Sequence, residues 1–410
     1  MWIKNRTVIF LLLFLETNIS AQIPGFYMEK GAKKIEIPFE QQDNFIILKV
    51  LFQGFFPLRF ILDTGAEHTI LTKKEVTNLL RISYEREMTI MGTDMRTQIK
   101  AYIARKVRLE LTNLTLVKDI LVLDEDYFKF DQFLGMDIHG ILGAETFKGY
   151  VLKVDYNRHV LTVYDPSVFR PSDHKKYEEL PIEIFRSKPY IRTSAQINSD
   201  TVVSLKLLLD TGAALALLLH TYSTPDLIMP PKVLKGTLGT GLGGQIEGYL
   251  GRIKSLKLGN SKLNYPVSNF QELINVADSN YLNGRNGLIG NETLSRFNFI
   301  VDFSGEKLYL QRNFNYKETF EFDKSGMTII AGGTSLNEYT VYDVFPNSPA
   351  FEAGILRGDE IVKIKWLPTS FYTLPSINSY LEGKVGKKIR LTVKRNGKKI
   401  KIQFILRELL

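Results

Sequence analysis

The chain has 410 residues, of which 44% are apolar and 24% charged. That balance is typical of ordinary globular protein and excludes collagen-like and intrinsically disordered classes. It contains no cysteine, which excludes disulfides, a thiol nucleophile and thiolate metal sites. The 53 Lys and Arg against 44 Asp and Glu give a formal charge of +9, which alone does not indicate nucleic acid as a partner.

Residues 1–21 have the pattern of a cleaved signal peptide. Lys4 and Arg6 precede an apolar run from Val8 to Leu15, and the small pair Ser20-Ala21 follows. A membrane anchor is the alternative, but spanning a bilayer takes about 20 apolar residues and Glu16 interrupts this run. We therefore expect export to a periplasmic or extracellular space, with no transmembrane segment after signal removal.

An internal repeat organises the next 300 residues. Residues 60–66 (FILDTGA) recur as 207–213 (LLLDTGA), an offset of 147, and the same offset carries 141–146 onto 288–293 and 154–156 onto 301–303. Each copy is a series of short β-branched and aromatic runs bounded by turn residues, which predicts strands. We expect strands at 33–38, 46–52, 58–62, 151–154, 160–164, 299–303 and 307–310, and helices only at 73–80 and near 271–276.

The C-terminal 90 residues follow a different pattern. Strands are predicted at 339–344, 361–364, 389–394 and 399–406, with a two-residue hairpin turn at Asn396-Gly397. The basic run 387–401 alternates with apolar residues, as expected of a solvated strand face rather than a nucleic-acid site. The sequence predicts four parts: a signal peptide at 1–21, a first lobe at 22–175, a second lobe at 176–315 and a third domain at 316–410.

The chemistry lies in the repeated turn. A single Asp-Thr-Gly after a strand can be an ordinary turn, but two copies offer equivalent carboxylates, Asp63 and Asp210. If the two lobes face each other, these carboxylates meet and cannot both ionise easily, so one keeps a proton. Such a pair can act as general acid and general base without a metal or cofactor, and none is expected.

The paired motifs resemble the aspartic protease signature over residues 35–313. Asp63-Thr64-Gly65-Ala66 and Asp210-Thr211-Gly212-Ala213 are each followed, about 80 residues on, by an apolar-apolar-Gly triplet (141–143 and 288–290). The Ala after Gly is similar to the retropepsin branch, and two lobes in one chain are similar to pepsin. The resemblance implies a mainly β fold of two acid-protease-type barrel lobes about a pseudo-two-fold axis, catalytic Asp63 and Asp210, and threonines that brace the two loops. We expect a peptide or protein substrate and a monomer.

The resemblance also implies substrate-binding residues. Glu67 takes the position that binds substrate backbone in retropepsins, whereas Ala214 follows the second motif, so the halves should bind peptide unequally. His68 is expected to be a surface or satisfied polar residue. Flap hairpins are expected around Gly92-Thr93 and Gly239-Thr240-Gly241, although simple connecting hairpins would have the same pattern. The letters G-x-G-x-x-G at 239–244 lack the following helix that a dinucleotide site needs.

Residues 316–410 resemble a PDZ domain, above all in the stretch from Ser348-Pro349-Ala350 to Gly358-Asp359. The family takes peptide C-termini by strand addition, on a loop that corresponds here to Gly326-Met327-Thr328-Ile329. A packing domain without a ligand is the alternative. The sequence as a whole predicts a secreted aspartic endopeptidase, with a catalytically silent peptide-binding or scaffold protein as the competing hypothesis.

Overall fold

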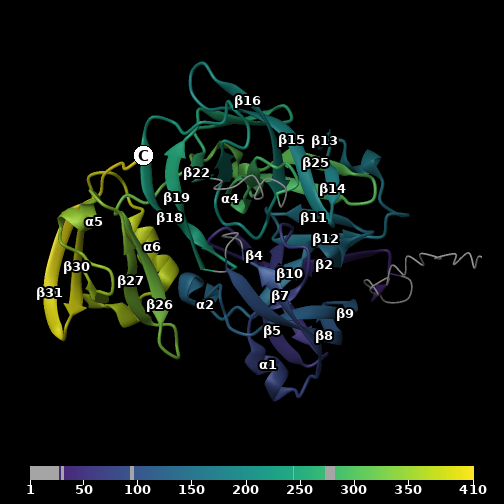
Figure 1. The fold of residues 1–410 in the computed structure, drawn as a ribbon, viewed down its shortest axis with the longest axis horizontal. Coiled ribbons are helices and arrows are strands. Elements are labelled where there is room, and N and C mark those ends of the chain that lie inside the picture. The colour runs from purple at the N-terminus through teal and green to yellow at the C-terminus, as the bar shows by residue number, and fades with distance from the viewer. Residues whose placement is uncertain (1–26, 29–31, 93–96, 243, 273–281) are drawn as a thin grey trace, which may run out of the picture.

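The computed structural model describes residues 27–28, 32–92, 97–242, 244–272 and 282–410. The predicted signal peptide lies outside these residues. The described chain is mainly β, with about half of it in strands, and its strands form four sheets (Figure 1).

The first sheet holds the first Asp-Thr-Gly motif. Its strands are β1 (Tyr27–Met28), β3 (Glu40–Gln42), β4 (Phe45–Phe52), β5 (Phe56–Asp63), β6 (Ile70–Leu71), β7 (Tyr84–Met91), β8 (Gln98–Leu111), β9 (Leu114–Leu123) and β10 (Gly140–Gly143). Its helices are α1 (Lys74–Leu79), α2 (Phe130–Leu134) and the 3₁₀ turn η1 (Ala144–Phe147). Strand β10 runs parallel to β5 and antiparallel to β6, and β6 runs parallel to β9.

The sheet that holds the second motif repeats this arrangement. Its strands are β14 (Glu183–Phe185), β15 (Lys188–Gln196), β16 (Val202–Leu209), β17 (Leu217–Thr221), β18 (Val233–Gly241), β19 (Gly244–Arg252), β20 (Ser255–Leu258), β21 (Ser261–Asn264), β22 (Val267–Glu272) and β23 (Gly287–Ile289). Strand β23 runs parallel to β16 and antiparallel to β17, and β17 runs parallel to β22. The short helix α4 (Asn291–Leu294) follows.

A third sheet joins the two copies of the repeat. It contains β2 (Lys34–Pro38), β11 (Val151–Asp155), β12 (Val160–Tyr164), β13 (Glu178–Pro181), β24 (Phe297–Asp302) and β25 (Lys307–Arg312), with η2 (Pro171–His174) before β13. At its centre β11 pairs antiparallel with β24, and Lys153 lies opposite Ile300. These two residues are 147 positions apart, which is the repeat offset, so equivalent residues face each other across the middle of this sheet.

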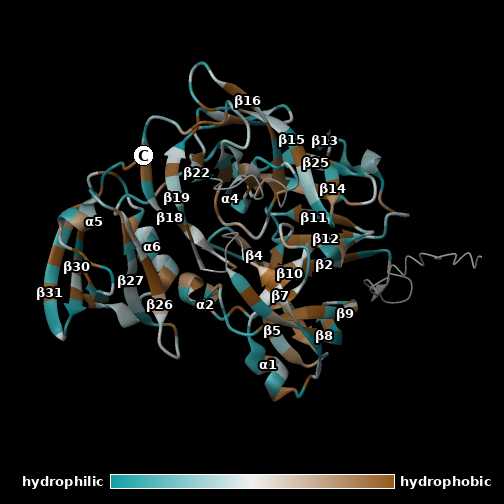
Figure 2. Cartoon of the chain, viewed as in Figure 1, coloured by the Kyte–Doolittle hydropathy of each residue, from teal (hydrophilic) through white to brown (hydrophobic). Residues whose placement is uncertain are grey.

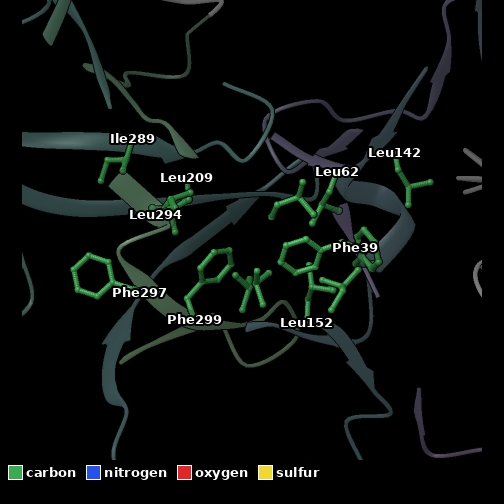
Figure 3. Close-up of a cluster of buried hydrophobic side chains, with 14 of the residues drawn as sticks. Phe39, Leu62, Leu142, Leu152, Leu209, Ile289, Leu294, Phe297 and Phe299 are labelled. Carbon is green, nitrogen blue, oxygen red and sulfur yellow. The ribbon is translucent and has the colours of Figure 1, made fainter. Parts of the chain in front are cut away.

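One hydrophobic core runs beneath both motifs (Figure 3). Three pairs of residues related by the offset line it: Leu62 with Leu209, Leu142 with Ile289, and Leu152 with Phe299. All are at most 3% exposed. Because the residue before each motif aspartate is anchored in this shared core, the two turns are held in fixed places relative to each other.

The C-terminal residues form the fourth sheet with its own core. Its elements are η3 (Phe314–Lys317), β26 (Met327–Gly332), β27 (Glu338–Val344), α5 (Pro349–Glu352), β28 (Glu360–Ile364), β29 (Leu367–Pro368), η4 (Thr369–Phe371), α6 (Leu374–Leu381), β30 (Lys388–Arg395) and β31 (Lys398–Ile405). Asn396 and Gly397 both have positive φ, as the predicted turn requires. Along β30 the apolar residues are buried and the charged ones outward, as predicted, and hydropathy alternates there (Figure 2).

The predicted strands are confirmed within one or two residues at each end. The predicted helix near 271–276 is wrong at its start, because Gln271 and Glu272 belong to β22 and pair with β17. The rest of that segment lies outside the described residues. No helix in the described part of the chain is long and apolar enough to cross a membrane.

Candidate active site

Each motif aspartate stands at the end of a strand that pairs with an apolar-apolar-Gly triplet. Asp63 ends β5 and lies opposite Gly143 of β10. Asp210 directly follows β16, and its backbone N–H donates to the carbonyl oxygen of Ile289 at 2.9 Å. Both turns therefore leave the carboxyl end of a strand that is buried on the core side, which fixes the direction in which each side chain points.

The two carboxyl groups lie against each other's turns. A Cβ atom added to Gly65 would lie 2.3 Å from Asp210 Oδ2, and one added to Gly212 would lie 2.2 Å from Asp63 Cγ. The two carboxyls also hydrogen-bond to each other. Glycine is therefore required at both positions, because any side chain would overlap the opposing carboxylate.

The threonines of the two motifs hydrogen-bond reciprocally. The Thr64 N–H donates to Thr211 Oγ1 and the Thr211 N–H donates to Thr64 Oγ1, each at 3.1 Å. The hydroxyl of Thr64 also donates to the Leu209 carbonyl at 2.7 Å, and that of Thr211 donates to the Leu62 carbonyl at 2.8 Å. Both threonines are at most 1% exposed. This buried network ties the turns together directly beneath the carboxyls.

The two carboxyls differ in their hydrogen bonds. Asp63 Oδ1 accepts two backbone bonds, from Gly65 N–H and Ala66 N–H, both at 2.8 Å. Asp210 Oδ1 accepts one, from Gly212 N–H at 2.9 Å. Since N–H donors stabilise the charged form, the surroundings favour the negative charge on Asp63.

The pKa values agree with this difference. Burial and then the charge of Asp63 raise the pKa of Asp210 to about 8. Burial raises the pKa of Asp63 as well, but its backbone hydrogen bonds and its bond from Asp210 oppose the rise. These differences favour the negative charge on Asp63 and the proton on Asp210.

The remaining motif residues support the turns. The carbonyl of Ala66 accepts from Ala144 N–H at 2.8 Å, and the carbonyl of Ala213 accepts from Asn291 N–H at 2.7 Å. Glu67 is half-buried beside the first turn. His68 is satisfied, because its Nδ1 lies 2.8 Å from Glu145 Oε2.

Hairpins lie at both predicted flap positions. In the first, Met91 pairs with Gln98 and the Gly92 N–H donates to the Thr97 carbonyl at 2.8 Å; Thr93 lies outside the described residues. In the second, β18 and β19 pair up to Gly241, with a bulge between Thr237 and Gly239, and the backbone of Thr240 pairs with that of Gln245. Its tip residue Leu242 packs on the apolar cluster around Ile61 and Ala66, so this hairpin crosses from the second sheet to the first motif.

Two cationic side chains, Lys188 and Arg285, influence the pKa values of the carboxyl pair, and the sequence analysis did not identify them. The ammonium of Lys188 lowers the pKa of Asp63, and the guanidinium of Arg285 lowers that of Asp210, both against the larger effect of burial. Neither residue belongs to a repeated motif, so no sequence pattern marked them. Within the described ranges, no group of three or more His, Asp or Glu could hold a metal ion.

The loop at 326–329 has the geometry of a turn entering an edge strand. Gly326 has φ +77°, and a Cβ there would lie 2.0 Å from Ser348 Cβ, so glycine is required. Met327, Thr328 and Ile329 begin β26, which pairs with β27 alone among the described strands. That leaves one edge of β26 without a strand partner, as strand addition needs.

Helix α2 of the first lobe lies against this edge strand (Figure 1). Phe133 packs edge-on against Tyr342 of β27, with ring centroids 5.1 Å apart. A Cβ added to Gly135, directly after α2, would lie 2.9 Å from Leu374 Cβ at the start of α6. The expected peptide site, the loop 326–329 and the strand β26 that follows it, therefore lies on a strand that α2 contacts.

Comparison with known families agrees with this geometry. Residues 48–146 match the aspartyl protease family model, and residues 340–395 match the PDZ domain model. The resemblance to an aspartyl protease with a PDZ domain is confirmed. The aspartyl protease match ends at Thr146, so the second motif of the protease-like body lies outside it.

The protease-like chain also has similar solved structures, and a search of curated proteins found no match. An aspartic proteinase from Irpex lacteus is 14% identical, with a TM-score of 0.44, and the alignment covers 70% of this chain and all of that one. Basic 7S globulin from soybean is 8% identical, with the same TM-score, covering 70% of this chain and 97% of that one.

Proposed function

We propose that the protein is a secreted aspartic endopeptidase, with two lobes related by a pseudo-two-fold axis and one active site between them. The observation that carries this is the contact of the Asp63 and Asp210 carboxyls above the reciprocal Thr64 and Thr211 hydrogen bonds. Lys153 and Ile300, which are equivalent residues of the two copies, pair opposite each other in the third sheet, and this pairing supports the same pseudo-two-fold axis. The N-terminal pattern at 1–21 supports export.

In the proposed reaction the two aspartates have different roles. Asp63 is ionised and takes a proton from a water molecule held between the carboxyls, and the water oxygen attacks the peptide carbonyl carbon. Asp210 is protonated and donates a hydrogen bond to the carbonyl oxygen, which stabilises the charge that develops there. The tetrahedral intermediate then collapses as the C–N bond breaks and the amine receives a proton from Asp63. No covalent bond to the enzyme forms.

Cleavage of a mixed peptide library tests this proposal. The chain without residues 1–21 is compared with its Asp63→Asn and Asp210→Asn variants, and with Asp200→Asn, an exposed aspartate in the second lobe, as the matched control. Both dyad variants should lose cleavage, whereas the control should keep it. Folded protein that cleaves nothing in any form would favour the scaffold hypothesis, and activity that survives one dyad substitution would contradict a shared site.

A further inference from the structure

The carboxyl pair is flanked by two walls that occupy equivalent places in the two lobes. The hairpins β3–β4 and β14–β15 turn through two residues of positive φ each, Asp43-Asn44 and Arg186-Ser187. Phe45 and Lys188 are the first residues after these turns. Two positions further on, Ile47 pairs with Ile61 and Tyr190 pairs with Leu208. Ile61 and Leu208 each stand two residues before a motif aspartate.

The first wall is apolar. Ile47, Ile61, Ile138 and Ile141 are at most 2% exposed and belong to one cluster, against which Phe45 packs. Phe45 also packs edge-on against Phe130, with ring centroids 5.8 Å apart. Phe45 is partly exposed, so it is the side chain through which this wall can contact an apolar residue of a substrate.

The second wall has charge at two of these places. Lys188 occupies the place of Phe45, because each is the first residue after its hairpin turn. Arg285 occupies the place of Ile138, because the two are separated by the repeat offset of 147. Tyr190 and Leu208 stand in place of Ile47 and Ile61. Both cations keep part of their surface exposed to solvent. The wall is therefore cationic as well as apolar.

The two cations of this wall form no ion pair within the part of the chain that the structure describes. There, neither Lys188 nor Arg285 has a carboxylate oxygen within 4.0 Å. Burial and then the charge of Arg285 lower the pKa of Lys188; Glu67 and Asp210 are the acids that oppose this. Two partly buried cations close to each other favour an additional anion, and a guanidinium binds a carboxylate through paired N–H donors.

We propose that Lys188 and Arg285 form a subsite for an acidic side chain of the substrate, so that the enzyme cuts between an apolar residue and an Asp or Glu. This rests on the proposed function and names its substrate class. The apolar residue lies on the wall of the first lobe and the acidic residue on the wall of the second. A basic residue on the second side would be repelled by both cations.

Cleavage-site mapping on a peptide library randomised on both sides of the bond tests the subsite. Asp and Glu should be enriched at one of the two flanking positions. A matched peptide pair with Glu or Gln there should differ by about 10- to 100-fold in kcat/KM, as expected for hydrogen bonds to a charged group. The preference should fall below about pH 4, where the glutamate side chain takes up a proton.

The variants Lys188→Phe and Arg285→Ile copy the residues of the first wall. Each should reduce the Glu over Gln ratio to within about 3-fold. Because the same carboxyl pair cuts both peptides, this ratio is independent of changes in the pKa of Asp63 or Asp210. Arg192→Gln removes an exposed charge further along β15 and should leave the ratio unchanged. A wild-type ratio near one, or an equal ratio in wild type and variants, would overturn the proposal.

Binding separates this inference from the proposed function. The same Glu and Gln peptides, labelled with a fluorophore, are titrated onto the Asp63→Asn chain and onto Asp63→Asn combined with Arg285→Ile. Tighter binding of the Glu peptide that Arg285→Ile abolishes supports the subsite even if no form cleaves. Equal binding of both peptides to the Asp63→Asn chain would overturn the subsite, whereas absent cleavage alone would count only against the endopeptidase.

Discussion

The backbone N–H of Thr64 donates to the hydroxyl of Thr211, and the backbone N–H of Thr211 donates to the hydroxyl of Thr64. These residues are 147 positions apart and almost fully buried. The exchange is what holds two distant turns at a fixed separation, and it explains why the carboxyls of Asp63 and Asp210 meet.

Removing one of these hydroxyls should loosen the pair. Thr64→Val keeps the shape but leaves the Thr211 N–H and the Leu209 carbonyl without partners. We expect the free energy of unfolding to fall by about 1–3 kcal/mol, the usual cost of unsatisfied buried groups. Denaturant unfolding measures this. Thr64→Ser retains the hydroxyl and should lose less than half as much; an equal loss in both variants would point to packing instead.

Substitution of Gly65 should affect the catalytic rate more than the stability of the fold. In Gly65→Ala the new Cβ overlaps the Asp210 carboxylate and displaces it. A shift of about 1 Å at a reacting group costs on the order of 100-fold in rate, so kcat should fall at least that far. Gly332→Ala is a suitable control, because among the described residues its Cβ would meet only the Glu338 carbonyl oxygen, at 3.7 Å. Wild-type kcat in Gly65→Ala would show that the two carboxyls do not act as one unit.

The pH profile should extend to neutral pH. Cleavage needs one proton on the pair, and the pKa of Asp210 is raised to about 8. As pH rises through that value Asp210 loses its proton, so kcat/KM should be retained at pH 7 and decline above about pH 8. A profile measured with a peptide that lacks titratable side chains checks this. Activity confined to pH below 5 would contradict the proton assignment.

His220 should make stability depend on pH. It is 2% exposed, and neither ring nitrogen has a hydrogen-bond partner among the residues that the structure describes. Burial, followed by the charge of Arg285, lowers its pKa to about 3. In the unfolded chain His220 therefore takes up a proton near pH 6.5, whereas in the folded chain it stays neutral down to about pH 3. Folded stability should fall by up to about 1.4 kcal/mol per pH unit as pH drops from about 6.5 towards 3.

The His220→Leu variant isolates this contribution. It removes the titrating group together with two unsatisfied nitrogens, so its stability at pH 7 should equal or exceed that of wild type. The difference in unfolding free energy between the two proteins should grow as the pH falls. A constant difference between pH 7 and 4 would mean that His220 is protonated or solvated in the folded state.

The contact between α2 and the PDZ domain should compete with peptide. Phe133→Ala removes its ring from Tyr342, and such aromatic pairs contribute about 0.5–1.5 kcal/mol. The variant should bind a pool of labelled peptides with free apolar C-termini up to about 10-fold more tightly than wild type. Phe371→Ala, which removes a ring that is 74% exposed, serves as control. Equal affinities for Phe133→Ala and wild type would place the peptide elsewhere.

The strands and the two motifs could be predicted because their patterns lie within short stretches of sequence and occur in both copies of the repeat. The sequence did not predict the cationic wall, and for Lys188 the reason is an insertion. Ile47 and Ile61 are 14 positions apart, whereas Tyr190 and Leu208 are 18 apart. The second lobe thus has four extra residues between these strands, and the gapless offset of 147 does not align Phe45 with Lys188.

The contact of α2 with the PDZ domain was equally invisible in the sequence. It joins Phe133 to Tyr342, over 200 positions away, and neither residue belongs to a repeated motif. Side chains on two separately folded sheets meet there, so only the tertiary structure brings them together.

The central claim is that Asp63 and Asp210 of one chain form a single active site. Mixing equal amounts of the Asp63→Asn and Asp210→Asn variants, refolded together, tests it most directly by peptide cleavage. If both carboxyls must come from the same chain, the mixture stays as inactive as either variant alone. Recovery of about a quarter of the wild-type activity is expected if lobes of different molecules pair at random. That result would show that the site forms between two molecules and would contradict the account.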